Sequence, residues 1–277
     1  MKRFMWPMRF LVIMAVLALP ALVQNAWPKI EQRFLDSALP PPTSSQKKEE
    51  PQTGDPAKKI VSAIDLFYEQ RPLQVVVYKI KRNSAISLIP NFTQKINAEK
   101  LVEDNGCAAA INGGFYQKNQ KPLGLFWTQG KSLGEKIDSN VATGYFWQDA
   151  DGSLHMGRSA PQKDASIFIV QTGPIFDLAN EQSVSIVDDE HARRSAIGKD
   201  GAGNFFLLTF YDPENLFSGP LLADLPSLAK RGELGKIANL TTLLNLDGGS
   251  ASFFYTKTGK HILSELVPVG SILCIKE

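Results

Sequence analysis

A polar turn with paired glycines directly follows an apolar run in Leu243-Leu244-Asn245-Leu246-Asp247-Gly248-Gly249-Ser250. The apolar part has the length of a strand. Paired glycines let the chain adopt positive φ angles and bring backbone amides close to a bound group. Asp247 would present its carboxylate above the sheet, at the end of the strand. The stretch therefore predicts a β-strand that ends in an anion or sugar site.

Three further polar clusters lie beside apolar stretches. Ala109-Ala110-Ile111-Asn112-Gly113-Gly114-Phe115-Tyr116 repeats the strand and paired glycines, and Gln171-Thr172-Gly173-Pro174 ends a strand with a hydroxyl and a glycine. Arg193 and Arg194 precede a strand of small residues, where planar guanidinium groups can clamp a phosphate or carboxylate. Each cluster alone is explained at least as well by an ordinary turn or a solvated loop. Four of them at strand ends favour one shared site.

Strand-length apolar stretches dominate the rest of the chain. They occupy residues 73–80, 107–111, 123–127, 145–147, 167–171, 205–210, 243–246, 252–255 and 272–275. Turn sequences at 149–152, 199–204 and 256–260 each join two apolar runs, which predicts hairpins and largely antiparallel pairing.

Two segments have the pattern of helices, one at 97–105 closed by Gly106 and one at 221–230 with leucines at helical spacing. We therefore predict an α+β fold with a largely antiparallel or mixed β-sheet core and a few packed helices. The whole would form a single globular domain.

The N-terminal segment has the pattern of an export signal. Lys2, Arg3 and Arg9 precede or begin an uncharged run over 10–23, which would span about 21 Å as a helix against ~30 Å for the hydrocarbon core. We expect residues 1–26 to be a signal peptide or an uncleaved membrane anchor. Residues 27–58 predict a Pro-rich disordered linker, and residues 59–277 the folded domain. The protein would be exported, and periplasmic or associated with the cell envelope.

The charge balance of the chain is even. The 30 Lys and Arg against 28 Asp and Glu become 27 against 28 once the three basic residues of the leader are removed. Binding of a nucleic acid needs a clustered basic excess, so we expect no nucleic-acid partner. Contact with a membrane would run only through the N-terminal segment, and the sequence leaves the oligomeric state open.

Common catalytic and cofactor motifs are missing from the sequence, including a zinc-binding His-Glu-x-x-His, a Gly-x-Ser-x-Gly elbow and a dinucleotide-binding Gly-x-Gly-x-x-Gly. We expect no cofactor and no metal site. His155, His191 and His261 are scattered, and we expect each at the surface. Cys107 and Cys274 either form one bridge or remain buried thiols.

The four clusters, in this order, resemble the phosphodiester glycosidase family, over a region from about Gly106 to Cys274. The motifs that carry the resemblance are Ile111-Asn112-Gly113-Gly114-Phe115-Tyr116, Thr172-Gly173-Pro174, Arg194-Ser195-Ala196-Ile197-Gly198 and Leu244-Asn245-Leu246-Asp247-Gly248-Gly249-Ser250. The resemblance implies hydrolysis of a sugar-1-phosphodiester, or of a phosphorylated glycan, at the anomeric carbon. The products would be the free sugar and a phosphomonoester.

The residue chemistry suggests a division of roles for that reaction. A phosphate leaving group has a second pKa of about 6 and needs positive charge more than a general acid. We expect Arg194, with Arg193 as second choice, to supply this charge with help from the amides of Gly113 and Gly114. Asp247 would be the nucleophile or the base for water. Asn112, the third catalytic candidate, and Thr172 would hold sugar hydroxyls or phosphate oxygens, and Ser250 would steady the Asp247 turn. The other expected substrate contacts are Gly173, Gly248 and Gly249.

Several alternatives stay open at this point. Glycosidases commonly use two carboxylates, and the second could be any of Glu135, Asp177, Glu190 and Asp212. A non-catalytic envelope module could use the same clusters to bind phosphorylated glycans. A metal-dependent phosphodiesterase could use Asp247 and Asn112 as ligands, although hard cations prefer more oxygen ligands than these two residues supply.

Overall fold

A computed structural model of the protein describes residues 61–180, 186–258 and 263–277. The predicted export signal (1–26) and linker (27–58) lie outside the described residues, and so does His261. The described residues form three β-sheets with three short α-helices, and every strand pair in them is antiparallel. The predicted α+β class and antiparallel pairing are confirmed.

The largest sheet has six strands. In spatial order they are β1 (Val61–Tyr68), β2 (Arg71–Lys79), β12 (Phe205–Tyr211), β11 (Arg194–Asp200), β13 (Leu240–Asn245) and β10 (Ile175–Asp177). Strand β2 is apolar on both faces because both are buried: Val75 and Val77 pack in one core cluster, and Val76 and Tyr78 in another. The six-stranded sheet is therefore the middle layer of the domain.

Two smaller sheets cover one face of this layer. The four-stranded sheet has the order β14 (Phe254–Thr256), β4 (Ala109–Asn112), β15 (Ser271–Lys276) and β3 (Ala85–Pro90). The five-stranded sheet has the order β6 (Lys131–Gly134), β5 (Phe126–Thr128), β9 (Ser166–Thr172), β7 (Gly144–Asp149) and β8 (Leu154–Gly157). One hydrophobic core joins side chains of all three sheets, and Phe126, Phe146 and Leu273 in it are at most 1% exposed.

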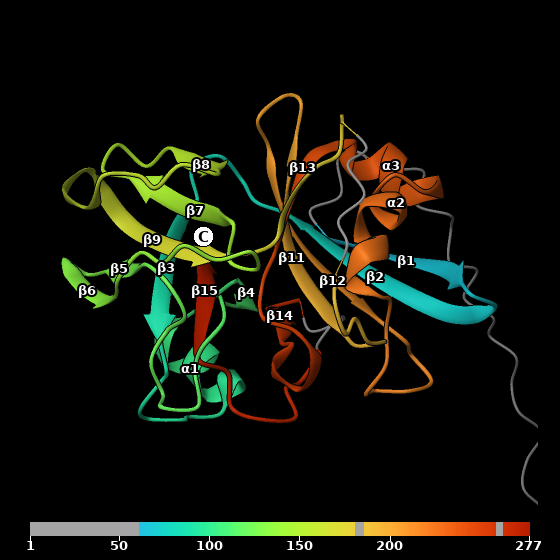
Figure 1. Ribbon diagram of the computed structural model, residues 1–277, viewed down its shortest axis with the longest axis horizontal. Helices are drawn as coiled ribbons and strands as arrows, with labels where there is room; N and C mark the ends of the chain where they lie inside the picture. The colour runs from blue at the N-terminus through green and yellow to red at the C-terminus, as the bar shows by residue number, and fades with distance from the viewer. Residues whose placement is uncertain (1–60, 181–185, 259–262) are drawn as a thin grey trace, which may run out of the picture. The chain divides into compact units, whose positions relative to one another are not determined.

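The helices close the two outer faces (Figure 1). Helices α2 (Leu225–Ala229) and α3 (Gly232–Ala238) pack on the free face of the six-stranded sheet. Helix α1 (Ala98–Asn105) packs on the four-stranded sheet. The prediction for α1 is confirmed in detail, since Asn97 Oδ1 accepts from the amides of Glu99 and Lys100 and Gly106 takes the left-handed conformation at the end.

The second predicted helix, 221–230, is only partly confirmed. Its first turn is a 3-10 turn at Leu222–Asp224, and the α-helix begins at Leu225 because Pro226 fits only at a helix start. Helix α3 was not predicted, since Gly232 and Gly235 lower its helix propensity.

Two of the three predicted hairpins are confirmed. Turn 149–152 joins β7 to β8, and turn 199–204 joins β11 to β12. The third, at 256–260, falls partly outside the described residues. The structure also settles the cysteines: Cys107 and Cys274 form a disulfide with a Cα–Cα distance of 5.4 Å, joining the residues before β4 to β15.

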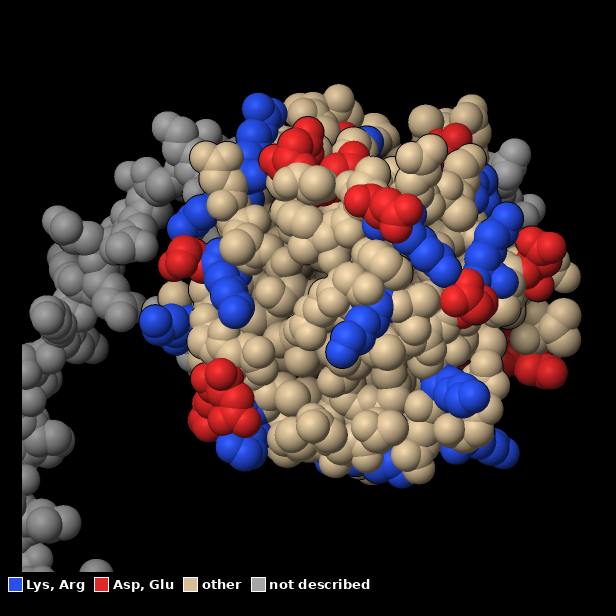
Figure 2. Space-filling view, turned by 90° about the vertical axis from the view of Figure 1, so that its left-hand side faces the viewer, with Lys and Arg blue, Asp and Glu red and all other residues tan. Residues whose placement is uncertain are grey.

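Charged side chains are dispersed on the face seen in Figure 2. Lys and Arg alternate with Asp and Glu around its rim, and neither sign gathers into a patch. The even charge of the whole sequence is therefore repeated in the charge distribution over this face.

Candidate active site

The four polar clusters meet where the ends of strands from all three sheets converge. Asn112 ends β4, Thr172 ends β9, Arg194 begins β11 and Asn245 ends β13. Hydrogen bonds join the clusters: Ser195 Oγ donates to Asn112 Oδ1 at 2.6 Å, and Thr172 Oγ1 donates to the Asn245 carbonyl at 3.0 Å. The shared location predicted from the sequence is therefore present in the structure.

Asn112 is the centre of this network. Its Nδ2 donates to the backbone carbonyl of Asp247 at 2.7 Å and to that of Gly113 at 3.3 Å. Its Oδ1 accepts from Ser195 and from the amide of Phe253 at 3.0 Å. The side-chain amide has two donors and two acceptor positions, and all four are used within the protein. Asn112 thus positions the Asp247 backbone, and no donor is left for a substrate.

Asp247 carries the most perturbed carboxyl group among the described residues. Its Oδ1 accepts from the amide of Gly248 at 2.9 Å, and its own amide donates to the Gly113 carbonyl at 3.1 Å. Burial raises the pKa of Asp247 to about 7, because desolvation disfavours the carboxylate more than the Gly248 amide stabilises it. The group is therefore divided between its acid and base forms near neutral pH.

Arg194 lies beside the turn that follows Asp247. Its Nε donates to the Pro220 carbonyl at 3.1 Å, and its Nη2 donates to Asp189 Oδ1 at 3.0 Å and to the Glu190 carbonyl. A Cβ built on Gly248 would lie 4.0 Å from Nη1. Nη1 makes no hydrogen bond within the described part of the chain and lies against Gly248, on a side chain that is 11% exposed.

Arg193 has different surroundings from Arg194. It is 1% exposed, and its three nitrogens donate to the carbonyls of Gly249, Ser250 and Ser264 at 2.9–3.2 Å. Burial lowers the pKa of Arg193, and the Glu265 carboxylate partly opposes this. Arg193 therefore holds the turn after Asp247 through its backbone carbonyls, and a substrate cannot reach its guanidinium.

Gly113 and Gly114 differ in what their amides can do. The Gly113 amide donates to the Ser271 carbonyl at 2.8 Å, and a Cβ at this position would lie 2.1 Å from Ser271 Oγ. The Gly114 amide makes no hydrogen bond to any described residue. Of the two predicted amide donors, only that of Gly114, on buried backbone, has no partner among the described residues.

Thr172, Gly173 and Ser250 complete the predicted set. Thr172 is fully buried and bonded to Asn245, while Gly173 has φ +155° and accepts from Asn245 Nδ2 at 2.8 Å. A Cβ on Gly173 would lie 2.4 Å from the Val141 carbonyl. Both residues thus shape the site from below. Ser250 is exposed and lies three residues after Asp247, where its hydroxyl can meet a ligand.

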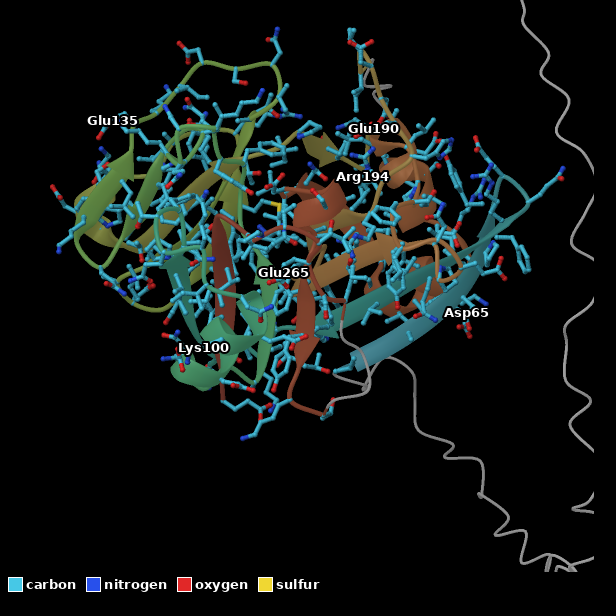
Figure 3. All side chains as sticks on the ribbon, turned by 90° about the horizontal axis from the view of Figure 1, so that it is seen from below. Asp65, Lys100, Glu135, Glu190, Arg194 and Glu265 are labelled. Atoms are coloured by element: carbon cyan, nitrogen blue, oxygen red, sulfur yellow. A yellow bond between two sulfur atoms is a disulfide. The ribbon has the colours of Figure 1, made fainter. Side chains whose placement is uncertain are left out.

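The four candidates for a second carboxylate have other contacts. Glu135 pairs with Lys163 at 2.8 Å on the outer edge of the five-stranded sheet, far from Arg194 in Figure 3. Asp177 bonds the amides of Ala179 and Asn180, and Asp212 bonds those of Glu214 and Asn215. Glu190 is exposed beside Arg194. No described carboxylate contributes to the pKa of Asp247, so none of the four is placed as its partner.

Sequence reasoning missed several residues of the site. Asp189 holds Arg194 and also accepts from the amides of Leu222 and Ala223. Tyr116 is half-buried and lies close to Asp247. Burial is the main cause that raises the pKa of Tyr116, and the Asp247 carboxylate raises it further. The adjacent Gly113-Gly114 motif was a signal for Tyr116, whereas nothing in the sequence pointed to Asp189.

The described residues contain no group of three or more His, Cys, Asp and Glu side chains placed to hold a metal ion. Asn112 could bind a metal ion only through its Oδ1, which already accepts two hydrogen bonds. His155 stacks on Trp147 and His191 pairs with Glu69, each with a side chain 40% exposed. Neither histidine contacts Asp247.

A model of the phosphodiester glycosidase family matches residues 105–276. The chain therefore belongs to the phosphodiester glycosidase family, and the matched region contains all four clusters. No curated protein sequence matches the chain significantly.

One solved structure shows the likeness in fold. The catalytic domain of zebrafish N-acetylglucosamine-1-phosphodiester alpha-N-acetylglucosaminidase, auto-inhibited by its pro-peptide, aligns with a TM-score of 0.55 at 18% identity, covering 78% of this chain and 82% of that one. A hypothetical protein from Synechocystis aligns with a TM-score of 0.47 at 13% identity, over 78% of this chain and 61% of that one. At 18% identity the first likeness shows the fold.

Proposed function

We propose that this protein is an exported hydrolase that cleaves a glycosyl phosphodiester at the anomeric carbon and releases the sugar and a phosphomonoester. The observation that carries the proposal is the Asp247 carboxyl, with a pKa of about 7, in a turn whose next residue, Gly248, lies against the fixed side chain of Arg194. Family membership supports the reaction class.

The arrangement suits a phosphate leaving group. As the bond from the anomeric carbon to the phosphate oxygen breaks, its electron pair goes to that oxygen. Arg194 Nη1 and the Gly114 amide would stabilise the resulting charge, both being held in place before the reaction. A phosphate needs little protonation to leave. One carboxylate is then sufficient, which agrees with the pKa of Asp247, to which no other carboxylate among the described residues contributes.

Asp247 in its ionised form would support the developing positive charge on the sugar. As a base, it would take a proton from the attacking water while the water oxygen bonds to the anomeric carbon, and would later release that proton to solvent. As a nucleophile, it would form a glycosyl ester that water then hydrolyses. Tyr116 and Ser250 lie where they can contact sugar hydroxyls, and Asn112, Thr172 and Arg193 position the turn that carries Asp247.

The cellular location is part of the same proposal. Residues 1–26 would export the chain or anchor it, residues 27–58 would form the linker, and residues 59–277 would hold the activity. The Cys107–Cys274 disulfide fits an oxidising compartment such as the periplasm or cell envelope. No helix in the described ranges is long and apolar enough to cross a membrane.

The test is product identification by mass spectrometry after incubating the full chain with sugar-1-phosphodiesters. N-acetylglucosamine-1-phosphodiester is the first choice, because the zebrafish enzyme is named for it. Free sugar and phosphomonoester, lost in Asp247→Asn and kept in Asp164→Asn, are expected. Sugar-1-phosphate as product would instead indicate P–O cleavage and the metal-dependent alternative. Binding without turnover in both the wild type and Asp247→Asn would indicate a non-catalytic glycan-binding module.

A further inference from the structure

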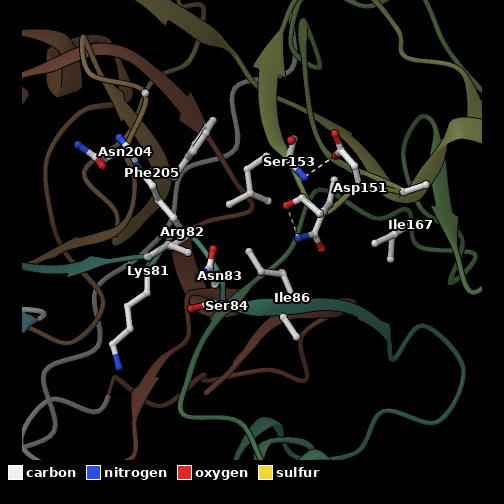
Figure 4. Close-up of a pocket in the computed structure, with 17 residues that line it drawn as sticks. Lys81, Arg82, Asn83, Ser84, Ile86, Asp151, Ser153, Ile167, Asn204 and Phe205 are labelled. Carbon is white, nitrogen blue, oxygen red and sulfur yellow. Dashed lines mark hydrogen bonds between the residues drawn. The ribbon is translucent and has the colours of Figure 1, made fainter.

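A second candidate site lies at the opposite end of β11. A cavity of about 830 Å³ opens between the six- and five-stranded sheets, lined by the turns at 81–84, 150–153 and 203–204 (Figure 4). Strand β11 separates it from the Asp247 cluster, since Arg194 and Asp200 stand at its two ends, about 20 Å apart at ~3.3 Å per residue. No predicted site residue lines this cavity.

Amide side chains with unused hydrogen-bonding capacity line the cavity. Asn83 is exposed and makes no side-chain hydrogen bond to any described residue. Gln148 donates its Nε2 to the Gly152 carbonyl at 2.9 Å, and Asn204 donates its Nδ2 to Asp200 Oδ2 at 2.7 Å. The Oε1 of Gln148 and the Oδ1 of Asn204 accept no hydrogen bond within the described residues. The wall thus offers both donors and acceptors to a ligand.

The charges of the lining cancel. The lining holds Lys81, Arg82 and Asp151, and Glu277, just outside it, pairs with Lys81 at 2.6 Å, so the four charges sum to zero. Ile167 adds an apolar patch that is 45% exposed. A neutral wall of amides with an aliphatic patch suits a ligand that has many hydroxyls and apolar C–H faces. A phosphate or a carboxylate would find no net positive charge here.

We propose that this cavity binds a neutral saccharide segment, as a glycan-binding site separate from Asp247. Its volume lies within the range of about 300–1,000 Å³ that small-molecule sites occupy. The three turns that form it are internally hydrogen-bonded, with Ser84 to Lys81, Gly152 to Asp149 and Gly203 to Asp200, so the wall is formed before the ligand arrives. The site rests on its own lining and is independent of the proposed hydrolysis.

The test is isothermal titration calorimetry of the full chain with three neutral tetrasaccharides, of glucose in α-1,4 linkage, of glucose in β-1,4 linkage and of N-acetylglucosamine in β-1,4 linkage. Asn83→Trp would fill the cavity mouth, and Ile167→Asp would place a charge on its apolar patch. Both side chains are exposed, so both variants are expected to fold. The matched controls are Asn140→Trp on an exposed loop and Leu133→Asp, which is 40% exposed on β6 of the same sheet.

We expect at least one tetrasaccharide to bind the wild type, and each cavity variant to weaken that binding about tenfold or more. Both controls and Asp247→Asn should bind as the wild type does. The inference is overturned if no neutral tetrasaccharide binds, or if the cavity variants bind equally well. Binding that requires a phosphorylated saccharide and is lost in Arg82→Ala would equally contradict a neutral ligand.

Discussion

The two ends of strand β11 use polar side chains in opposite ways. At the Arg194 end, Asn112, Thr172 and Arg193 are at most 1% exposed. Their side chains donate hydrogen bonds to backbone carbonyls of the protein. At the Asp200 end, Asn83, Gln148 and Asn204 line an open cavity, and the Asn83 side chain and the side-chain oxygens of the other two have no partner among the described residues. The first end is built to hold one carboxylate still, and the second to receive a ligand.

This difference shows that polar motifs at strand ends need not touch the substrate. The residues that stand out in the sequence at the Arg194 end mostly support the turn that carries Asp247. Preorganisation of this kind is what electrostatic catalysis requires, because donors and charges fixed in advance do not have to reorganise during the reaction. Four measurements follow, from the largest expected effect to the smallest.

Replacing the central carboxylate should have the largest effect on activity. We expect Asp247→Asn to lower kcat/KM for a sugar-1-phosphodiester by about 10³-fold or more, since the variant keeps the Gly248 hydrogen bond but cannot act as base or nucleophile. Steady-state kinetics check this, with exposed Asp164→Asn as the control. Unchanged activity in Asp247→Asn would remove Asp247 from the reaction.

The raised pKa of Asp247 also predicts a pH-dependent stability. The folded pKa of about 7 exceeds the ordinary value of 3.8, so the folded protein binds the proton more tightly and loses stability as pH rises from about 4 through 7. Asp247→Asn has no such loss. Its free energy of unfolding relative to wild type should increase by up to about 4 kcal/mol between pH 4 and pH 8. Urea unfolding at both pH values checks this, and a difference that does not change with pH would contradict it.

Arg194 and an ordinary surface arginine should differ clearly. We expect Arg194→Ala to lower kcat/KM about 100-fold, because the charge facing the leaving phosphate is lost. Arg231→Ala, on an exposed residue before α3, should leave kcat/KM unchanged. Equal activities of the two variants would show that Arg194 has no role in the reaction and serves only as the ion-pair partner of Asp189.

Asparagine deletions compare the two ends of β11 directly. Asn112→Ala would leave the part-buried carbonyl of Asp247 and the buried hydroxyl of Ser195 without their partner, so we expect a loss of about 2 kcal/mol of unfolding free energy. Asn83→Ala at the open cavity should change it by less than about 0.5 kcal/mol. Chemical denaturation of both variants checks the contrast, and equal losses would contradict it.

The fold was predictable where one local signal dominates. Asn97 and Gly106 define α1 from the sequence because cap residues have strong conformational preferences. Helix α3 was missed because its glycines disfavour a helix, and packing of Leu234 against the six-stranded sheet outweighs them. Edge strand β1 was missed because the polar residues Ser62 and Asp65 interrupt its apolar run.

The location of the site was predictable, but the contacts of its residues were not. Sequence motifs predicted that Asn112, Arg194 and Asp247 belong to one site. They cannot show which hydrogen-bond donors of these residues are already used within the protein. That depends on distances between strands far apart in the chain, such as the 2.6 Å between Ser195 and Asn112. Asp189 was not predicted because the amides of Leu222 and Ala223, from which it accepts, come from a distant segment, although Arg194 lies only five residues along the chain.

The bond that is cleaved is the central claim, and hydrolysis in ¹⁸O-labelled water tests it most directly. Attack of water at the anomeric carbon, supported by Asp247, would place the label on the sugar and leave the phosphomonoester unlabelled. The label is measured in the phosphomonoester by mass spectrometry, because exchange of the anomeric oxygen of the free sugar with water does not affect that product. A label in the phosphomonoester would show attack at phosphorus and contradict the account.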